Sequence, residues 1–176
     1  MSTQNLVAAS IPVLSPTDTV AKAIQLCEDN KLAALPVAND GEYVGTVTED
    51  SLLEASDDTM TVSDAGLLGF KPAISEFAHP YEAFTIMHDA RLTILPVTDS
   101  HQRYLGSISR EGLVDYFATQ TAIASPGGIM VIEVAPRSYS LYDVARICEN
   151  EDVAILGMEM NTTPEGMQRI TLKLNR

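Results

Sequence analysis

Two hydroxyl side chains occupy the positions in this sequence that are best suited to bind an anion. Thr48 and Ser109 end two matching segments, Tyr-Val-Gly-Thr-Val-Thr and Tyr-Leu-Gly-Ser-Ile-Ser, and each precedes a run with helical character. A hydroxyl at the start of a helix lies beside backbone N–H groups that have no partner within the helix, and the same geometry stabilises a phosphate. The pattern therefore predicts either two anion-binding positions or two ordinary helix caps.

The other chemically active residues form no catalytic or metal-binding constellation. The three histidines are expected at a helix start, within a helix and in a hairpin turn: His79, His88 and His101. Cys27 and Cys148 fall in helical patterns and have no neighbouring His or Lys to lower their pKa. A Gly-rich phosphate loop of the Walker type is absent from the sequence. We therefore predict that the protein is not an enzyme, holds no metal and requires no cofactor.

Composition narrows the classes of partner. The chain has 176 residues, 11 Lys and Arg against 24 Asp and Glu, a net charge of −13, and 45% hydrophobic residues. That hydrophobic share argues against disorder, and the acid excess argues against nucleic-acid binding, which needs Lys and Arg to neutralise phosphates. Apolar runs are far shorter than the ~20 residues that cross a bilayer, so no membrane partner is expected. Two cysteines and no secretory signal favour a cytoplasmic protein.

An internal repeat organises the first two thirds of the chain. Three pairs of matching segments follow in the same order: 12–15 with 72–75, 32–37 with 92–97, and 43–48 with 104–109. The last pair is displaced by one extra residue, which falls in a turn, where insertions are tolerated. The sequence therefore contains two copies of one unit.

Each copy reads as strand, helix, strand, strand, helix. Thr17 or Asp18 is the predicted cap of the first helix, and Pro80 falls in the first turn of the corresponding helix in the second copy. Pro36 is expected at a strand end or bulge, because proline cannot donate to a sheet ladder. Residues 39–41, Asn-Asp-Gly, predict a hairpin turn.

This unit resembles the cystathionine-β-synthase (CBS) domain, a small β-α-β-β-α module that works in pairs. The resemblance rests on residues 35–37 and 95–97, both Leu-Pro-Val, and on segments 45–48 and 106–109, each of which leads into a helix. It places one repeat at residues 6–58 and another at 59–119. One such unit buries too little surface to be stable alone. The resemblance implies a pseudo-two-fold pair whose inter-repeat clefts hold adenosine nucleotides or related ligands.

The resemblance also identifies candidate ligand-binding residues in that cleft. They are Pro12, Val13, Leu35, Pro36, Thr46, Thr48, Ser51, Pro72, Ile74, Pro96, Ser107, Ser109 and Arg110. In the family, an Asp three residues after the hydroxyl binds the ribose. Here Ser51 and Gly112 stand at those positions, and Asp50 and Glu111 come one residue early, about 100° away around a helix. Binding of AMP, ATP or a related ligand is therefore expected to be weak.

The last third of the chain is a different module. Residues 120–128 read as a linker, and 129–176 predict a strand, a helix capped by Ser138 or Ser140, and two further strands. This order resembles the start of an ACT-like (ferredoxin-like) domain, although Tyr139 stands where ACT domains usually have a glycine. The sequence ends before a second helix and a fourth strand. We therefore expect either that these strands are completed by dimerisation or that the chain is a shortened one.

Together these observations predict an α+β protein: two CBS repeats packed as a pseudo-two-fold pair, followed by a short β-α-β-β ACT-like segment. The predicted function is non-catalytic regulation or ligand sensing, with an adenosine-type nucleotide bound weakly between the repeats. The alternative is a ligand-free dimerisation or adaptor module. In both cases we expect a homodimer, and the sequence does not identify the protein that it would regulate.

Overall fold

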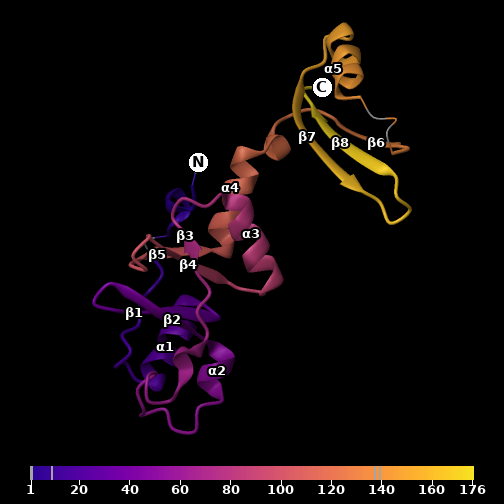
Figure 1. Ribbon diagram of the computed structural model, residues 1–176. Helices are drawn as coiled ribbons and strands as arrows, with labels where there is room; N and C mark the ends of the chain where they lie inside the picture. The colour runs from indigo at the N-terminus through magenta and orange to yellow at the C-terminus, as the bar shows by residue number, and fades with distance from the viewer. Residues whose placement is uncertain (1, 9, 137, 139) are drawn as a thin grey trace. The chain divides into compact units, whose positions relative to one another are not determined.

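The structure, a computed structural model, describes residues 2–8, 10–136, 138 and 140–176. It divides into two compact units, Met1–Val114 and Asp115–Arg176, with the division inside helix α4 (Arg110–Gln120) (Figure 1). Across the described residues, no helix has both the length and the apolar character needed to cross a membrane.

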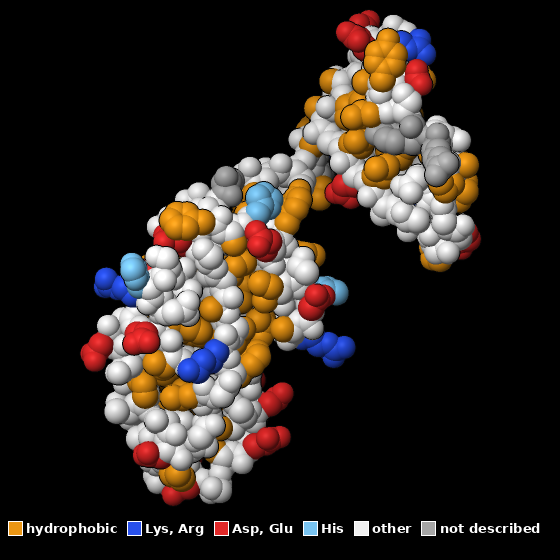
Figure 2. Space-filling model, in the orientation of Figure 1, with side chains coloured by type: hydrophobic (Ala, Val, Ile, Leu, Met, Phe, Trp, Pro, Cys, Tyr) orange, Lys and Arg blue, Asp and Glu red, His pale blue; other side chains and the backbone are white. Residues whose placement is uncertain are grey.

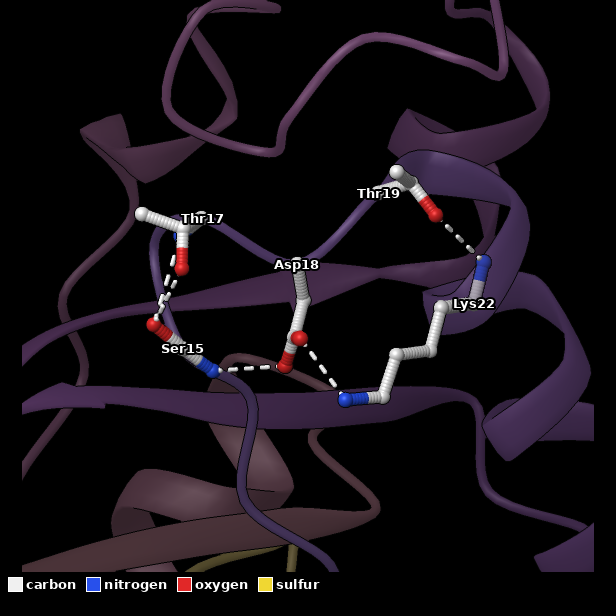
Figure 3. Close-up of polar contacts among 5 residues, drawn as sticks. All are labelled: Ser15, Thr17, Asp18, Thr19 and Lys22. Carbon is white, nitrogen blue, oxygen red and sulfur yellow. Dashed lines mark hydrogen bonds and ion pairs between the residues drawn. The ribbon is translucent and has the colours of Figure 1, made fainter.

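Helix α1 (Val20–Asn30) opens the first repeat one residue later than predicted. Its cap is Thr19, whose Oγ1 accepts the N–H of Lys22 at 3.2 Å. Asp18, one of the two predicted caps, instead accepts the N–H of Ser15 at 2.9 Å and pairs with Lys22 Nζ at 2.7 Å (Figure 3). The prediction of Thr17 or Asp18 was wrong because Asp18 braces the preceding loop, which leaves the next hydroxyl to cap the helix.

A hairpin follows, as the Asn-Asp-Gly sequence predicts. Strands β1 (Ala34–Asn39) and β2 (Glu42–Thr48) pair antiparallel, and helix α2 (Glu49–Leu53) continues from β2. The two turn residues, Asp40 and Gly41, have φ values of 48° and 84°, the left-handed geometry of a type I′ turn.

Pro36 lies inside β1, opposite Thr46, and not at a strand end. The ladder shifts register directly after Val37, so the proline is one residue from a bulge. The Pro36 carbonyl accepts the N–H of Leu14. The nitrogen of Pro36 points to the same edge of β1, and pairing along that edge begins only at Leu14. No ladder bond is therefore lost.

The second repeat has the full predicted order, whereas in the first repeat the predicted first strand is reduced to a single parallel bridge between Leu14 and Val37. Strand β3 (Ile74–Ser75) leads to helix α3 (Pro80–Asp89), strand β4 (Ile94–Thr98), strand β5 (Tyr104–Ser109) and α4, and the sheet order is β3-β4-β5. Pro80 occupies the first turn of α3, as predicted, behind a capping box formed by His79 and Glu82. Pro96 repeats the position of Pro36, paired to Ser107 next to a register shift.

The segments that precede the repeats are exchanged between them. The 3-10 turn Thr3–Leu6 lies on the second repeat: the N–H groups of Thr3 and Ala8 donate to the carbonyls of Ala78 and Ser107 at 3.0 and 2.9 Å. Conversely, the turn Leu67–Gly69 leads to Phe70, whose carbonyl accepts the N–H of Thr46 in the first repeat at 2.8 Å. Each repeat is therefore completed by chain that precedes the other.

The two hairpins also bond to each other in a pseudo-symmetric way. The N–H of Tyr43 donates to the carbonyl of Gln102 at 3.0 Å, and the N–H of Tyr104 donates to the carbonyl of Gly41 at 2.8 Å. The rings of Tyr43 and Tyr104 stack with centroids 6.4 Å apart. We call this region, where β2 and β5 meet, the seam.

Apolar side chains of the helices and the sheet form the core of each repeat. The core of the first repeat comprises Leu14, Val20, Ala23, Cys27, Leu35, Val37, Val47, Leu52 and Val62. Equivalent residues of the second repeat are also buried, including Ile74, Ala83, Met87, Leu95, Val97, Ile108 and Leu113.

The second unit has the predicted β-α-β-β order. Strands β6 (Ile129–Val134), β7 (Ile155–Thr162) and β8 (Gln168–Leu174) form an antiparallel sheet of order β6-β8-β7, with helix α5 (Leu141–Asn150) between β6 and β7 in sequence (Figure 1). Ile170, Leu172 and Leu174 are buried on one face, which confirms their predicted alternation. Ser140 caps α5, whereas Tyr139 lies outside the described residues.

Candidate ligand-binding site

The strand–helix junction of the first repeat is a closed capping box. Thr48 Oγ1 accepts the N–H of Ser51 at 3.2 Å, and Ser51 Oγ accepts the N–H of Thr48 at 3.1 Å. Ser51 Oγ also donates its proton to the Thr48 carbonyl at 2.8 Å. The hydroxyl of Thr48 is still able to donate its own proton outward, whereas the proton of Ser51 is already engaged. At this junction only Thr48 has a hydroxyl proton to offer a phosphate.

The junction of the second repeat is simpler. Ser109 Oγ accepts the N–H of Gly112 at 3.0 Å and caps α4, so its proton is also available to a ligand. Gly112 has no side chain with which to bind a ribose. A Cβ built at Gly112 would lie 3.2 Å from Ser109 Oγ, so this junction is crowded as well as short of polar groups.

Arg110 follows Ser109, and its side chain bonds within the second repeat, to which it belongs. Its guanidinium donates to the carbonyl of Leu92 at 3.0 Å and lines a groove between α3 and α4. The side chain is exposed at that groove.

The hydroxyls at the seam are committed to tyrosines. Thr46 and Ser107 are 1% and 0% exposed, and each shares a hydrogen bond of 2.9 Å with a tyrosine hydroxyl, Tyr43 or Tyr104 respectively. Tyr43 also donates to the carbonyl of Pro72 at 2.8 Å. The Thr46 and Ser107 side chains therefore shape the seam from within and do not reach its surface.

Burial moves the pKa of both tyrosines further above neutral pH. It raises the pKa of Tyr43 to about 12; the hydrogen bond with Thr46 lowers this pKa and the charge of ionised Tyr104 raises it. Burial also raises the pKa of Tyr104, against the lowering effect of its bond with Ser107. At neutral pH both phenols are therefore hydrogen-bonding groups without charge.

The exchanged segments bring residues of one repeat against the other. Pro72 lies beside β2 of the first repeat through Tyr43, and Phe70 lies beside it through Thr46. Likewise, the N-terminal segment that leads to Pro12 bonds β5 at Ser107. Each seam edge thus combines a strand–helix junction of one repeat with the entry segment of the other.

The predicted site residues separate by burial. Those buried in the sheets are Leu35, Pro36, Thr46, Ile74, Pro96 and Ser107. Those with surface to offer a ligand are Pro12, Val13, Thr48, Ser51, Pro72, Ser109 and Arg110. Where the structure describes the chain, no three His, Cys, Asp or Glu side chains gather to hold a metal ion.

Sequence reasoning overlooked the tyrosine pair. Tyr43 and Tyr104 stand at equivalent positions of the repeat, so the signal was present in the matched segments 43–48 and 104–109. A polar aromatic residue repeated within an apolar strand indicates a partner for its hydroxyl, and here that partner is Thr46 or Ser107.

Comparison with known proteins agrees with the repeat. The family model of the CBS domain matches residues 4–58 and 71–119. A curated relative, inosine-5'-monophosphate dehydrogenase of Methanocaldococcus jannaschii, is 26% identical over 151 residues, which are 85% of this chain. The chain spans only 30% of the length of that dehydrogenase.

Solved structures share the fold. A CBS domain pair/ACT domain protein from Thermotoga maritima aligns with a TM-score of 0.62 and 18% identity, over 68% of this chain and 98% of its own. CBSX2 of Arabidopsis thaliana, in a complex with AMP, aligns with a TM-score of 0.58 and 22% identity, over 68% of this chain and 96% of its own. At 18% and 22% sequence identity, these similarities show that the fold is shared.

Proposed function

The chain belongs to the CBS domain family, and from that premise we propose that it is a non-catalytic regulatory module that binds an adenosine nucleotide weakly along its seam. The proposed arrangement is a repeat at 6–58, a repeat at 59–119, a linker at 120–128 and an ACT-like module at 129–176. Because Cys27 and Cys148 are both free, the reducing cytoplasm is the compartment that we propose.

The observation that carries the proposal is the matched pair of capping hydroxyls. Thr48 and Ser109 occupy equivalent junctions, and each accepts a backbone N–H while keeping a proton to donate. The relative CBSX2 has been solved in a complex with AMP, which supports an adenosine nucleotide as the ligand class. No cofactor is needed for such a role.

Weak affinity follows from the ribose side of the site. Neither Ser51 nor Gly112 supplies the carboxylate that the family uses, and Ser51 is closed back on Thr48. A charge-assisted hydrogen bond contributes about 1.5–3 kcal/mol, so the missing carboxylate lowers affinity by about ten- to hundredfold.

Restoring the carboxylate tests this proposal. We expect the full-length Ser51→Asp variant to bind AMP about ten- to hundredfold more tightly than the wild type in calorimetric titration. Ser51→Asn is the matched control, because it has nearly the same size but no charge, and it should bind no more tightly than the wild type. ATP, S-adenosylmethionine and NAD are titrated in parallel. Failure of both the wild type and Ser51→Asp to bind any of the four would refute the nucleotide proposal.

That failure would favour a second function, a ligand-free dimerisation or adaptor module. The closed capping box at Thr48 and Ser51 supports this alternative, because a junction that satisfies itself needs no ligand. For either function we propose that the protein acts as a homodimer.

A further inference from the structure

The three-stranded sheet of the second unit has one protected edge and one open edge. In the described part of that unit, β6 and β7 each pair with β8 alone, so each is an edge strand (Figure 1). The ladder of β7 shifts register between Ile155 and Gly157, and Glu159 adds an exposed charge along that strand. A bulge and a charge both hinder the addition of another strand, so the edge at β7 is protected.

The edge at β6 lacks this protection. Its ladder with β8 runs from Ile129 to Val134 without a register shift. Its one charged side chain, Glu133, is paired with Arg169 of β8 at 2.6 Å. A regular, apolar edge strand exposes N–H and C=O groups to which another chain can pair, and natural proteins usually cover or disrupt such an edge. Strand β6 is therefore the edge at which a further strand can add.

The hydrogen-bond pattern shows which residues of β6 face the open side. The N–H of Leu174 donates to the carbonyl of Gly128, just before β6, at 3.0 Å. Bonded pairs alternate along an antiparallel ladder, so the even-numbered residues of β6 bond β8. The backbone groups of Ile129, Val131 and Glu133 therefore point away from β8. The second unit presents hydrophobic side chains at several places on its surface (Figure 2), and Ile129 and Val131 are 70% and 57% exposed.

A cavity of about 160 Å³ opens beside this edge, between α5 and the sheet. Leu172 and Leu174 of β8 form its buried floor. Met130 of β6 and Ile147 of α5 are about half exposed at its mouth. An apolar cavity of ~150 Å³ holds a group as large as benzene, so this cavity fits a single aliphatic side chain.

The mouth of the cavity is acidic. Glu151 lines the cavity, and Glu149 and Asp152 line an adjoining hollow of about 450 Å³ that shares part of its wall. One cation is bonded here, because the guanidinium of Arg176 donates to the carbonyl of Glu151. Carboxylates at this place also face the negative end of the dipole of α5, which ends at Asn150. Three carboxylates against one guanidinium favour a cationic ligand.

The other described cations of this unit are bonded elsewhere. Their partners are Asp143 for Arg146, Glu133 for Arg169 and the carbonyl of Gly127 for Lys173. A second copy of the chain, paired antiparallel at β6, would bring its own α5 and the same acids to the same face of the sheet. A segment that carries Lys or Arg meets these acids with the opposite charge, which makes it the better occupant.

We propose that the groove between the open edge of β6 and α5 binds an extended, basic segment of another protein by strand addition. The segment lies antiparallel to β6, which continues the antiparallel sheet. One aliphatic side chain enters the cavity, and a Lys or Arg two residues away on the same face meets Glu151. Main-chain bonds then supply affinity, and the cavity supplies selectivity. This partner surface goes beyond the proposed function and does not depend on nucleotide binding.

A synthetic peptide and an edge substitution test the groove in the full-length chain. The probe is the capped peptide Thr-Lys-Val-Leu-Val-Lys-Thr, whose alternation places Leu and both Lys on one face. Calorimetric titration should show binding to the wild type, and Val131→Pro should weaken it by at least about fivefold. Proline removes an N–H that faces the open side and leaves the ladder with β8 intact. Val131→Thr, the matched control, keeps that N–H and should bind as the wild type does.

Peptide variants keep the test decisive if Val131→Pro fails to fold. In the antiparallel arrangement the N–H groups of both Val residues face β6, so their N-methylation should abolish binding. N-methylation of both Lys residues, whose N–H groups point away, should not. Replacing the peptide Leu with Asp should also abolish binding, because the cavity is apolar.

The acidic mouth has its own pair of variants. Glu151→Gln should weaken binding of the peptide by about two- to fivefold, whereas Glu159→Gln, on the protected edge, should leave it unchanged. A wild type that does not bind the peptide at millimolar concentration, or one that tolerates both methylation patterns equally, would refute strand addition. Sedimentation equilibrium should give Val131→Pro the mass of the wild type. A lower mass would show that a second copy occupies the edge, which would overturn the proposed occupant.

Discussion

The two seam tyrosines provide a matched pair of perturbations with unequal predicted costs. Tyr43→Phe removes a hydroxyl that bonds both Thr46 Oγ1, at 2.9 Å, and the Pro72 carbonyl, at 2.8 Å. Tyr104→Phe removes a hydroxyl whose bond goes to Ser107 Oγ, at 2.9 Å. The two substitutions delete the same atom at equivalent positions of the repeat.

The expected losses follow from the number of bonds. A buried hydrogen bond contributes about 1 kcal/mol net, so Tyr43→Phe should cost about 2 kcal/mol and Tyr104→Phe about 1 kcal/mol. The first unit spans residues 1–114. With an unfolding entropy of about 2.1 cal/mol/K per residue, those losses lower Tm by about 8 and 4 °C.

Urea and thermal unfolding of the full-length chain, followed by far-UV circular dichroism, measure both losses. A double-mutant cycle with Thr46→Val isolates the Tyr43–Thr46 bond from the Tyr43–Pro72 bond, which joins the repeats. Equal losses for the two tyrosines, or a larger loss for Tyr104→Phe, would refute our account of the seam.

Two further predictions concern the backbone and pH. Gly106 has φ of 136°, and a Cβ there would lie 2.1 Å from Val7 Cγ1, so Gly106→Ala should cost about 2–4 kcal/mol in urea unfolding, well above its counterpart Gly45→Ala; comparable losses would contradict the reasoning. Burial acts to raise the pKa of Asp18, but hydrogen bonds from Lys22 and the Ser15 N–H, with the charge of Lys22, outweigh it and lower the pKa. Because the folded pKa is the lower one, the contribution of Asp18 is present above about pH 4 and is lost as the pH falls through the folded pKa. Asp18→Asn should therefore destabilise the protein by about 1 kcal/mol at pH 7 and by less at pH 3, and a loss independent of pH would count against this ion pair.

Features with a local cause were predictable from the sequence. The Asn-Asp-Gly turn fixes the first hairpin because Asp40 and Gly41 tolerate positive φ. Alternation of Ile170, Leu172 and Leu174 specified the buried face of the last strand. The repeat itself was readable because both copies kept their apolar order.

Features that depend on competition between possible hydrogen-bond partners were not predictable from the sequence. Asp18 and Thr19 are both good caps, and only the loop bond to Ser15 shows which of them caps α1. Pro36 is tolerated within a strand because its nitrogen points to an edge of β1 where no ladder bond would form. That can be known only from the arrangement of the neighbouring strands. Ser51 was predicted as a residue of the ligand cleft, whereas the structure shows it closing a capping box with Thr48.

The exchanged N-terminal segment has a consequence for how the protein is made. Ala8 is synthesised about a hundred residues before its partner Ser107, which comes almost last of the first unit. Such distant pairing delays folding, because a long loop must close before the contact forms. The segment that contains Ala8 therefore has no partner for this bond until β5 has been translated.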